Sequence, residues 1–570
     1  MLCEIAPFVG HPGGDRTITI LERAAALQIL HVDGFARREI EVNSQTIIDR
    51  SAPLPVDVYW NKSKRSDHPM VDRQHAEEFL KRLPRDDPAR TLEEISFWLK
   101  ALRDAYGVVP ERAFEVVDLL DVTAKTPQRQ LTSDFVALGS RYQRYQAQRT
   151  WHVSFQFSRE LGATYQHLLD HYRRGVGIGG SEALKPHLTT IVARAIRALR
   201  LELKWSLLRQ GPVDSVLWKL AGTLYGFAEE AGLATENLKL YPGTVEFTSA
   251  QLEYLQVLML SVSATDTLAP EMVHLVDSLV ERHAEFFALT RRPRRGVHYF
   301  VDLAGAGTPA RLVDRVPPNA AIRYFGPDKA SDMLDRLIDV ISERGMVPAE
   351  LNPGGTHKAP AILEVLDHLM RYWDPTPPTR ASERTSHLTR ISVVHDFDSV
   401  LNMVSGESQE LDFDSNVETW SVENESQGGY GAVITETNSE WLEIGTMLGI
   451  KEEEGASWGV GLVRRLTRRS ADKIYVGVES LSRGVVKVSI SNTAQTSGPR
   501  VDALLLLSSR EGSAQSSELT LMLPPGTFSP GDAASMRAFG RTYRLLPKQL
   551  REHGAGYEVA RFRLEPEEST

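Results

Sequence analysis

Between residues 71 and 373 the apolar positions repeat with the 3.6-residue period of an α-helix. In the clearest window, five residues fall on one helical face: Leu92, Ile95, Leu99, Leu102 and Tyr106. The Asp-Asp-Pro sequence at 86–88 supplies a start for this helix. A second long window runs over 182–208 and ends before a Gln-Gly-Pro sequence at 210–212. Similar amphipathic windows lie at 111–121, 127–147, 150–173, 214–232, 249–262, 269–290, 330–345 and 358–373.

Short connections that carry Gly, Pro or Asp separate these windows. About ten successive helices with short joints predict either a helical bundle or a solenoid of antiparallel pairs. No fixed repeat period is present, which favours the bundle. One segment inside this region, His298–Leu303, alternates like a strand.

After a Pro-rich joint at 374–380 the pattern changes to the two-residue alternation of β-strands. The short predicted strands are Ile391–Val394, Thr419–Val422, Ala432–Thr435, Gly459–Val463, Tyr475–Val478, Val485–Ile490, Ala503–Ser508, Leu519–Leu523, Thr542–Leu546 and Glu558–Leu564. Polar turns separate them, and this spacing predicts one or two small antiparallel β-barrels.

The fold class is therefore α+β and multidomain, with a large, mainly α-helical region followed by one or two small barrels. We predict a mixed N-terminal segment at 1–70, a helical domain at 71–373 and a Pro/Arg-rich linker at 374–390. The first barrel is expected at 391–498 and a second, smaller one at 499–570.

Composition narrows the class of protein. Hydrophobic residues make up 42% of the chain and charged residues 25%, as in ordinary globular proteins. No apolar run is long enough for a transmembrane segment, and the first residues lack the basic start of a secretory signal. The only cysteine, Cys3, cannot form an internal disulfide, so a cytoplasmic location is expected. The net charge of −10 makes DNA or RNA an unexpected partner.

The segment 420–431, Trp-Ser-Val-Glu-Asn-Glu-Ser-Gln-Gly-Gly-Tyr-Gly, reads as a strand that enters a tight turn. Asn424 and Ser426 occupy alternate positions and so share one face. The following glycines allow a backbone to approach a ligand closely. Upstream, the linker carries Arg380, Arg384 and Arg390. Guanidinium groups bind phosphate in bidentate fashion and read the O6/N7 edge of guanine, so this pattern predicts a site for a planar, anionic ligand.

The pair Arg380 and Arg384 in an Arg-x-x-x-Arg spacing, followed by Asn-x-Ser-x-x-Gly at Asn424, Ser426 and Gly429, resembles the signature of PilZ domains. The resemblance continues through 444–450, 458–466 and 475–482 and covers about 380–490. PilZ domains are bacterial six-stranded barrels that bind cyclic di-GMP. Nothing in the helical region is recognised as a known family.

The resemblance implies a role for each matching residue. Arg380 and Arg384 would hold phosphate and guanine, Asn424 and Ser426 would hydrogen-bond the ligand, and Gly429 would shape the turn. Arg390 is an alternative partner for Arg384.

An insert at 407–425 contains seven acidic residues and no basic one, and negative charge near the pocket would oppose a dianionic ligand.

Other motifs point mainly to structural roles. Residues 175–180 fit Gly-x-Gly-x-x-Gly formally, but a helix precedes them where a dinucleotide site requires a strand. His167 and His171 share a helical face without a third metal ligand, so they are expected to be structural. The basic cluster at 464–469 is either a ligand or partner surface or a solvated hairpin, and the cluster at 291–295 is either a partner site or the charged C-terminal end of a helix. His395 and Asp396 sit at a strand end and not on helices, which disfavours a metal-dependent phosphohydrolase.

The preferred hypothesis is a bacterial, non-enzymatic effector in which a PilZ-like barrel senses cyclic di-GMP and the helical region docks a protein partner. The alternative is a nucleotide-independent interaction scaffold with a degenerate barrel. An enzyme is not expected, since no P-loop, Gly-x-Ser-x-Gly element or catalytic cysteine is found. No metal or cofactor is expected beyond the cyclic di-GMP ligand itself.

Overall fold

The computed structural model describes the chain from residue 70 to residue 566 with internal gaps. The gaps are at 71–72, 106–107, 138–143, 176–179, 314–318, 350, 353–356, 377, 379–383, 387–388, 407–416, 436–440, 454, 456, 471, 493–499, 508–517 and 539–540. The predicted mixed segment at 1–70, except its last residue, and Arg380 lie outside the described residues.

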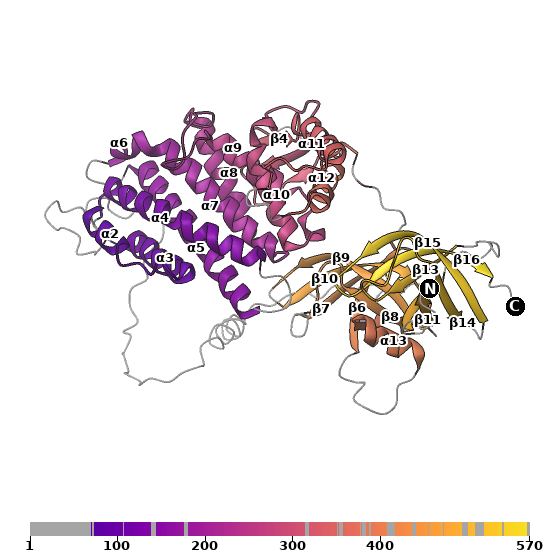
Figure 1. Cartoon of the computed structure of the whole chain (residues 1–570). Coiled ribbons are helices and arrows are strands. Elements are labelled where there is room, and N and C mark those ends of the chain that lie inside the picture. Colours follow the sequence, from indigo (N-terminus) through magenta and orange to yellow (C-terminus); the bar gives the residue numbers. More distant parts are fainter. Residues whose placement is uncertain are drawn as a thin grey trace, which may run out of the picture. The chain divides into compact units, whose positions relative to one another are not determined.

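The first part of the described chain is a packed set of helices (Figure 1). The helices are α2 (Arg73–Leu80), α3 (Pro88–Asp104), α4 (Pro110–Ala137), α5 (Arg144–Arg174), α6 (Gly180–Leu184), α7 (Leu188–Leu208), α8 (Ser215–Glu230), α9 (Ala250–Ser261), α10 (Pro270–Arg282), α11 (Ala330–Arg344) and α12 (Ala359–Trp373). Short 3-10 turns lie at η1 (Lys185–His187), η2 (Thr265–Thr267) and η3 (Ala284–Phe286).

The predicted apolar stripes form the core of this region. On α3 the side chains of Leu92, Ile95, Leu99 and Leu102 are all buried. The helix starts at Asp87, whose carboxylate accepts a hydrogen bond from the backbone N–H of Arg90 (2.9 Å). The sequence pattern therefore placed the start of α3 and four residues of its buried face correctly, and the fifth predicted residue, Tyr106, lies outside the described residues.

Helix α7 lies at the centre of the helical region and is buried on almost every side. It packs against α5, α8, α9 and α10. One helix surrounded by four others is the arrangement of a bundle, the favoured alternative of the sequence pattern.

A small antiparallel sheet interrupts the predicted helical region. Its strands are β1 (Ala288–Thr290), β2 (Tyr299–Asp302), β3 (Ala310–Arg311) and β4 (Ile322–Gly326), in the order β1-β4-β2-β3. Only β2 matches a predicted strand. The others span two to five residues, too few for a two-residue alternation to stand out from its surroundings.

The first closed barrel follows the linker. It consists of β5 (Thr389–His395), β6 (Glu418–Ser426), β7 (Gly429–Thr435), β8 (Met447–Glu452), β9 (Gly459–Arg468) and β10 (Lys473–Ser482). The strands are ordered β10-β7-β6-β5-β8-β9, and every pairing is antiparallel. The unpredicted helix α13 (Phe397–Ser405) joins β5 to the segment before β6 and packs on an apolar cluster with residues of both barrels.

The second closed barrel consists of β11 (Val485–Asn492), β12 (Val501–Leu506), β13 (Glu518–Leu523), β14 (Ala534–Ala538), β15 (Arg541–His553) and β16 (Glu558–Pro566). Its strands are ordered β11-β12-β13-β16-β15-β14. Strand β11 starts two residues after β10 ends but pairs only with strands of the second barrel, although it lies before the predicted boundary at 498/499. The fold class predicted from the sequence is confirmed, with two barrels. Within the described residues, no helix is both long and apolar enough to span a membrane.

Candidate functional site

The linker is held against the first barrel where the sequence predicted a site. Thr385 and Glu425 form an isolated antiparallel bridge, with reciprocal backbone N–H to carbonyl hydrogen bonds of 2.8 and 3.0 Å. This bridge brings Arg384 beside the end of β6, although forty residues separate Arg384 from Asn424 in the chain. Two parts of the predicted site are therefore neighbours in the fold.

Arg384 and Asn424 converge above Gly431. A guanidinium nitrogen of Arg384 donates a hydrogen bond to the hydroxyl of Tyr475 on β10 (2.9 Å). Gly431 on β7 pairs with Asn424 on β6 and Gly477 on β10. A Cβ atom at Gly431 would overlap the Tyr475 hydroxyl and lie 2.6 Å from the side-chain oxygen of Asn424. The missing side chain of this glycine is what allows the polar groups to meet.

The side-chain oxygen of Asn424 is buried and has no hydrogen-bond donor among the described residues. A buried acceptor without a donor costs free energy unless a ligand or a small rearrangement supplies one. Guanine carries neighbouring N–H donors, so its chemistry complements this amide. The side-chain oxygen of Asn424 therefore suits the N–H groups of a nucleobase better than a ligand carbonyl or carboxylate, which would offer only acceptors.

Ser426 and Gly429 have different roles from one another. The hydroxyl of Ser426 makes a long hydrogen bond to the carbonyl of Gly429 (3.4 Å), across the turn between β6 and β7. Gly429 has a φ of 149°, and a Cβ atom there would overlap the carbonyl oxygen of Val478 on β10. Glycine is required because β7 and β10 approach closely, so Gly429 shapes the barrel and leaves Ser426 as the polar group of the turn.

Arg390 is exposed on β5, opposite Ser421 of β6. Among the described residues, no hydrogen bond or ion pair joins Arg390 to Arg384, Asn424 or Tyr475. The structure thus places Arg384, through its hydrogen bond to Tyr475, near the amide of Asn424, and it places Arg390 opposite Ser421.

Two arginines that the sequence analysis did not assign to the site flank it. The Arg469 guanidinium lies over the Tyr475 ring, 4.6 Å from its centroid, and pairs with Glu423 (2.8 Å). Arg483 pairs with Glu425 (2.7 Å) and also donates to the carbonyl of Ser426 (3.1 Å). Residues 468–469 stood out in the sequence only as part of a basic run, and an isolated Arg483 gave no signal.

These pairs also determine the electrostatics of the site. Glu423 and Glu425 are the last two carboxylates of the acidic insert, and both are held by arginines. Their charge is neutralised within the barrel surface, so the repulsion expected for an anionic ligand is reduced. Both pairs are partly exposed, which allows a ligand to compete for the arginines.

The remainder of the basic run on β9 is paired as well. Arg464 pairs with Glu479 (2.7 Å) and Glu552 (2.6 Å), and Arg465 pairs with Asp266 (3.0 Å). The sequence alone left open whether these arginines form a ligand or partner surface or are solvated. In the structure, Arg464 and Arg465 pair with carboxylates of the protein itself.

A second concentration of charge, which the sequence analysis missed, lies on α7. Arg194, Arg197, Arg200 and Lys204 are buried or nearly so. Arg194 pairs with Asp118 (2.6 Å), Arg197 with Glu253 (2.9 Å), Arg200 with Asp277 (2.8 Å), and Lys204 also with Asp277 (2.8 Å). The available signal was a row of basic residues three and four positions apart on an otherwise apolar helix.

The pKa values in this cluster follow from burial and pairing. Burial alone would raise the pKa of Asp277, but Arg200 and Lys204 hold it below its ordinary value. Burial, followed by the charge of Lys204, lowers the pKa of His274 to about 4. The carboxylate is therefore charged and the imidazole neutral at physiological pH.

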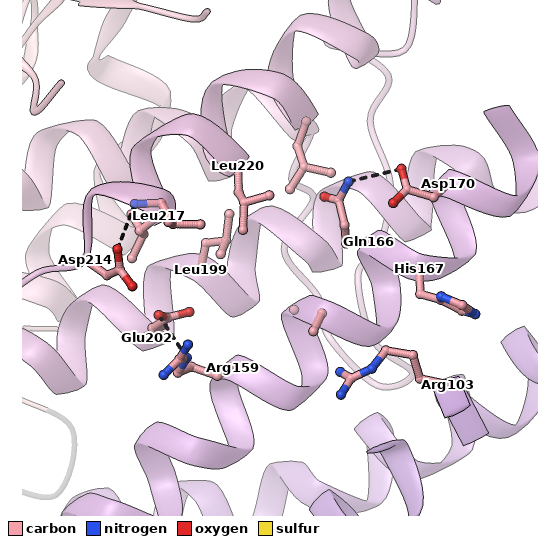
Figure 2. Close-up of a pocket in the computed structure, with 14 residues that line it drawn as sticks. Arg103, Arg159, Gln166, His167, Asp170, Leu199, Glu202, Asp214, Leu217 and Leu220 are labelled. Carbon is pink, nitrogen blue, oxygen red and sulfur yellow. Dashed lines mark hydrogen bonds and ion pairs between the residues drawn. The ribbon is translucent and has the colours of Figure 1, made fainter. Parts of the chain in front are cut away.

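A pocket lies between α5, α7 and the start of α8 (Figure 2). Its volume is about 280 Å³, and Leu199, Leu217 and Leu220 line it. Figure 2 shows Glu202 of α7 facing Arg159 of α5, and the two groups lie 3.6 Å apart. Burial raises the pKa of Glu202 to about 7, because this ion pair does not offset the loss of hydration.

Of the remaining sequence motifs, the Gly-x-Gly-x-x-Gly segment at 175–180 lies mostly outside the described residues, because 176–179 are not described, and the others have structural partners. His167 and His171 contact each other through their Nε2 atoms (2.9 Å). No group of three or more His, Cys, Asp or Glu within the described residues could hold a metal ion. In the 291–295 cluster, Arg291 pairs with Glu229 (2.9 Å).

Asp396, singled out with His395 in the sequence, caps α13 by accepting a hydrogen bond from the N–H of Ser399 (2.8 Å). His395 stacks on Trp441, with ring centroids 4.2 Å apart.

Comparison with known proteins adds a finding for the helical region. Residues 74–294 match a family model described as "Cyclic-di-GMP receptor FimW, N-terminal domain". No curated protein matches the chain. The family match therefore runs from α2 through α10 to just after β1, where the sequence analysis recognised nothing. The resemblance of the first barrel to PilZ domains stays a prediction, supported by the closed six-stranded barrel and by the meeting of Arg384 with Asn424.

Proposed function

We propose that this chain is a cyclic di-GMP receptor whose first barrel binds the nucleotide at Arg384, Asn424 and Ser426. The observation that carries the proposal is the convergence of the Arg384 guanidinium, the Tyr475 hydroxyl and the Asn424 amide above Gly431. The similarity of the helical region to the N-terminal domain of a cyclic di-GMP receptor supports the same ligand independently of the barrel.

Each group has a defined task in this proposal. Arg384 is exposed, and its hydrogen bond within the described part of the chain is to a neutral hydroxyl, so it can turn to a phosphate or a guanine edge at little cost. The unsatisfied oxygen of Asn424 accepts from the guanine N–H groups. Arg469, which already lies over an aromatic ring, is placed to stack on a purine.

The helical region is proposed to dock a protein partner and to respond to the ligand through the hairpin between β9 and β10. The backbone N–H of Arg468 donates to the carbonyl of Gln210 (2.8 Å), and its Nε donates to the carbonyl of Arg209 (3.0 Å). The neighbouring Arg469 contacts the Tyr475 ring. A ligand that moves Arg469 therefore acts one residue away from the contacts that Arg468 makes just after α7. Such a ligand would shift the population between two arrangements of the first barrel and the helical region.

Titration calorimetry with pure cyclic di-GMP tests the barrel site. We expect Arg384→Ala to weaken binding by about 10- to 100-fold, because a charge-assisted hydrogen bond contributes about 1.5–3 kcal/mol. Asn424→Ala should be similar and Ser426→Ala smaller. Arg537→Ala, which removes an exposed arginine from β14 of the second barrel, is the matched control.

Equal heats for wild type, Arg384→Ala and Asn424→Ala would eliminate this site. A loss of binding in Arg390→Ala with none in Arg384→Ala would assign the role to the other arginine. A protein partner that binds equally well with and without the nucleotide would favour the scaffold alternative, which is supported by the pairing of Arg469 and Arg483 with carboxylates of the barrel itself.

A further inference from the structure

A set of unpaired basic side chains lies on the second barrel. Its strands β14, β15 and β16 follow one another in the sheet (Figure 1). They carry six exposed Lys or Arg side chains that form no hydrogen bond or ion pair with any described residue: Arg537, Arg541, Arg544, Lys548, Arg551 and Arg563. In the first barrel, by contrast, Arg464 and Arg465 are both paired with carboxylates. The basic groups of the second barrel are therefore free to meet a partner.

The carboxylates of these three strands do not balance this charge. Glu552 pairs with an arginine of the first barrel (2.6 Å), and the Glu558 carboxylate accepts hydrogen bonds from the backbone N–H groups of residues 526–528. Glu565 alone lacks a partner among the described residues of these strands. Arg561, the remaining basic residue, lies 3.9 Å from Glu518 of β13. The unpaired cations therefore outnumber the unpaired carboxylate on these strands, in a chain whose net charge is −10.

Three of the unpaired arginines share the outer face of the barrel. Arg537, Arg544 and Arg563 are exposed, and each follows or precedes a buried core residue on its strand: Met536, Leu545 and Phe562. In the strand registers, Arg544 lies two residues from the partner of Arg537, and Arg563 lies two residues from the partner of Arg544. Such diagonal neighbours are about 7–8 Å apart. The three arginines therefore form one oblique row across β14, β15 and β16.

This row is unfavourable for the chain by itself. Neighbouring guanidinium groups repel one another, although water and salt weaken the repulsion at an exposed surface. A partner that offers one carboxylate to each arginine removes the repulsion and adds charge-assisted hydrogen bonds, which guanidinium and carboxylate groups form in bidentate geometry. The row is thus complementary in charge to an acidic molecule.

The spacing of the row indicates the shape of that molecule. In an extended polypeptide the side chains of one face recur at every second residue, about 6.6–6.8 Å apart. This repeat is close to the separation of the arginines, so carboxylates at alternate residues of an extended segment can each meet one guanidinium group.

The neighbours of the row favour a polypeptide over a nucleic acid. Sites for single-stranded nucleic acids combine basic groups with aromatic rings on which the bases stack. No ring is present among the cross-strand partners of the three arginines, which are Ser489, Glu518, Ser535, Thr542, Leu546 and Glu565.

We propose that the row Arg537, Arg544 and Arg563 binds an acidic segment of a protein partner, in extended conformation and with Asp or Glu at every second residue. The surface belongs to the second barrel, so the proposal does not rest on the nucleotide site of the first barrel.

Fluorescence anisotropy on the full chain, with a labelled synthetic peptide in which Glu and Thr alternate, tests the proposal. We expect wild type to bind this peptide and added salt to weaken the binding. Arg544→Glu, at the centre of the row, should weaken it about tenfold, because one ion pair is replaced by a repulsion. Arg563→Glu should act similarly and Arg537→Ala less. These side chains are exposed, so folding should persist, and circular dichroism checks this.

Arg541→Glu is the matched control. It changes the net charge of the chain by the same amount as Arg544→Glu and alters an exposed arginine of the same strand. Arg541 pairs with the buried Ala538 and so belongs to the other set of alternate positions, outside the row. We expect it to change the affinity less than twofold, and a loss as large as that of Arg544→Glu would overturn the row as the binding site.

Other results would overturn the assignment of the partner. A peptide of the same composition with its Glu residues grouped together should bind more weakly, and equal binding would overturn the alternate spacing. Tighter binding of single-stranded DNA, or of vesicles of anionic phospholipid, would assign the surface to another class of partner. No binding of the alternating peptide to wild type would refute the proposal. Arg384→Ala should bind the peptide as wild type does, and Arg544→Glu should still bind cyclic di-GMP, so failure of one site is distinguishable from failure of the other.

Discussion

Arg200 and Asp277 on the helical side and Arg464 and Glu479 on the barrel form ion pairs of nearly equal length, 2.8 and 2.7 Å. The first two side chains are 3% and 4% exposed, the second two 39% and 48%. The helical pair cannot separate without leaving a charge in an apolar interior, whereas the barrel pair exchanges readily with water and ions. Ion pairs of similar length therefore form a rigid framework in the helical region and exposed, exchangeable contacts on the barrel.

This contrast separates the cations of α7 from those of the barrel site. Around α7 the cations are held in place by carboxylates and belong to the framework of the helical region. On the barrel, Arg384, Arg469 and Arg483 are partly or fully exposed and can reorient toward a ligand, at a cost in side-chain entropy. The following predictions test how far the two regions differ.

The largest effect is expected from Asp277→Asn. This change leaves Arg200 and Lys204 buried without their shared carboxylate, so the free energy of unfolding should fall by about 3–5 kcal/mol. Urea denaturation measures the loss. Glu285→Gln, at an exposed acid just after α10, is the control and should change stability by less than about 0.5 kcal/mol. A loss for Asp277→Asn as small as that of the control would show that the network is not structural.

The next effect is expected from a change of backbone conformation at Gly429 in the first barrel. Gly429→Ala should destabilise the chain by about 2–3 kcal/mol, because its φ of 149° disfavours alanine and the new methyl group would overlap the Val478 carbonyl. Gly428→Ala is the neighbouring control, since a Cβ atom there meets nothing closer than the Ser426 hydroxyl at 3.9 Å. Thermal unfolding compares the two variants, and equal melting temperatures would contradict the close approach of β7 and β10.

Glu202 gives a dependence on pH. Its pKa is raised to about 7 by burial, so the folded state holds this proton more tightly than the unfolded state does. The resulting stabilisation is complete below about pH 4.5 and is lost as the pH rises through 7. Glu202→Gln should therefore be more stable than wild type by about 3 kcal/mol at pH 8 and nearly equal to it at pH 4.5. Urea midpoints at the two pH values measure this, and a constant difference would refute the shifted pKa.

The smallest effect is expected from Glu479→Gln on the barrel. Its pair with Arg464 is partly exposed, and Arg464 keeps Glu552 as a second partner. The free energy of unfolding should change by about 0.5 kcal/mol or less, and added salt should remove the difference. A loss of several kcal/mol would mean that the barrel charges form a framework like that of α7.

Much of the fold was predictable from local patterns. The buried stripe of α3, the N-cap at Asp87 and most barrel strands followed from periodicity and turn residues. Strands β1, β3 and β4 are too short to show a period, and α13 was hidden between strand-like segments.

The candidate barrel site was predictable in part. Arg384, Asn424, Ser426 and Gly429 were identified from a motif, but Tyr475 was read only as part of a strand, and Arg483 was not singled out. Tyr475 reaches the site by the pairing of β10 with β7, and Arg483, just after β10, reaches it by its contacts with Glu425 and Ser426.

The sequence by itself determined which segments are helices and strands, because each element carries its own apolar face and end signals. It also determined that an arginine linker precedes an Asn-x-Ser-x-x-Gly turn. The tertiary structure alone decided that Arg384 contacts Tyr475 beside Asn424, and that the four cations of α7 pair with carboxylates from α4, α9 and α10. Such contacts join residues far apart in the chain, and their distances depend on strand register and helix packing, which no local pattern specifies.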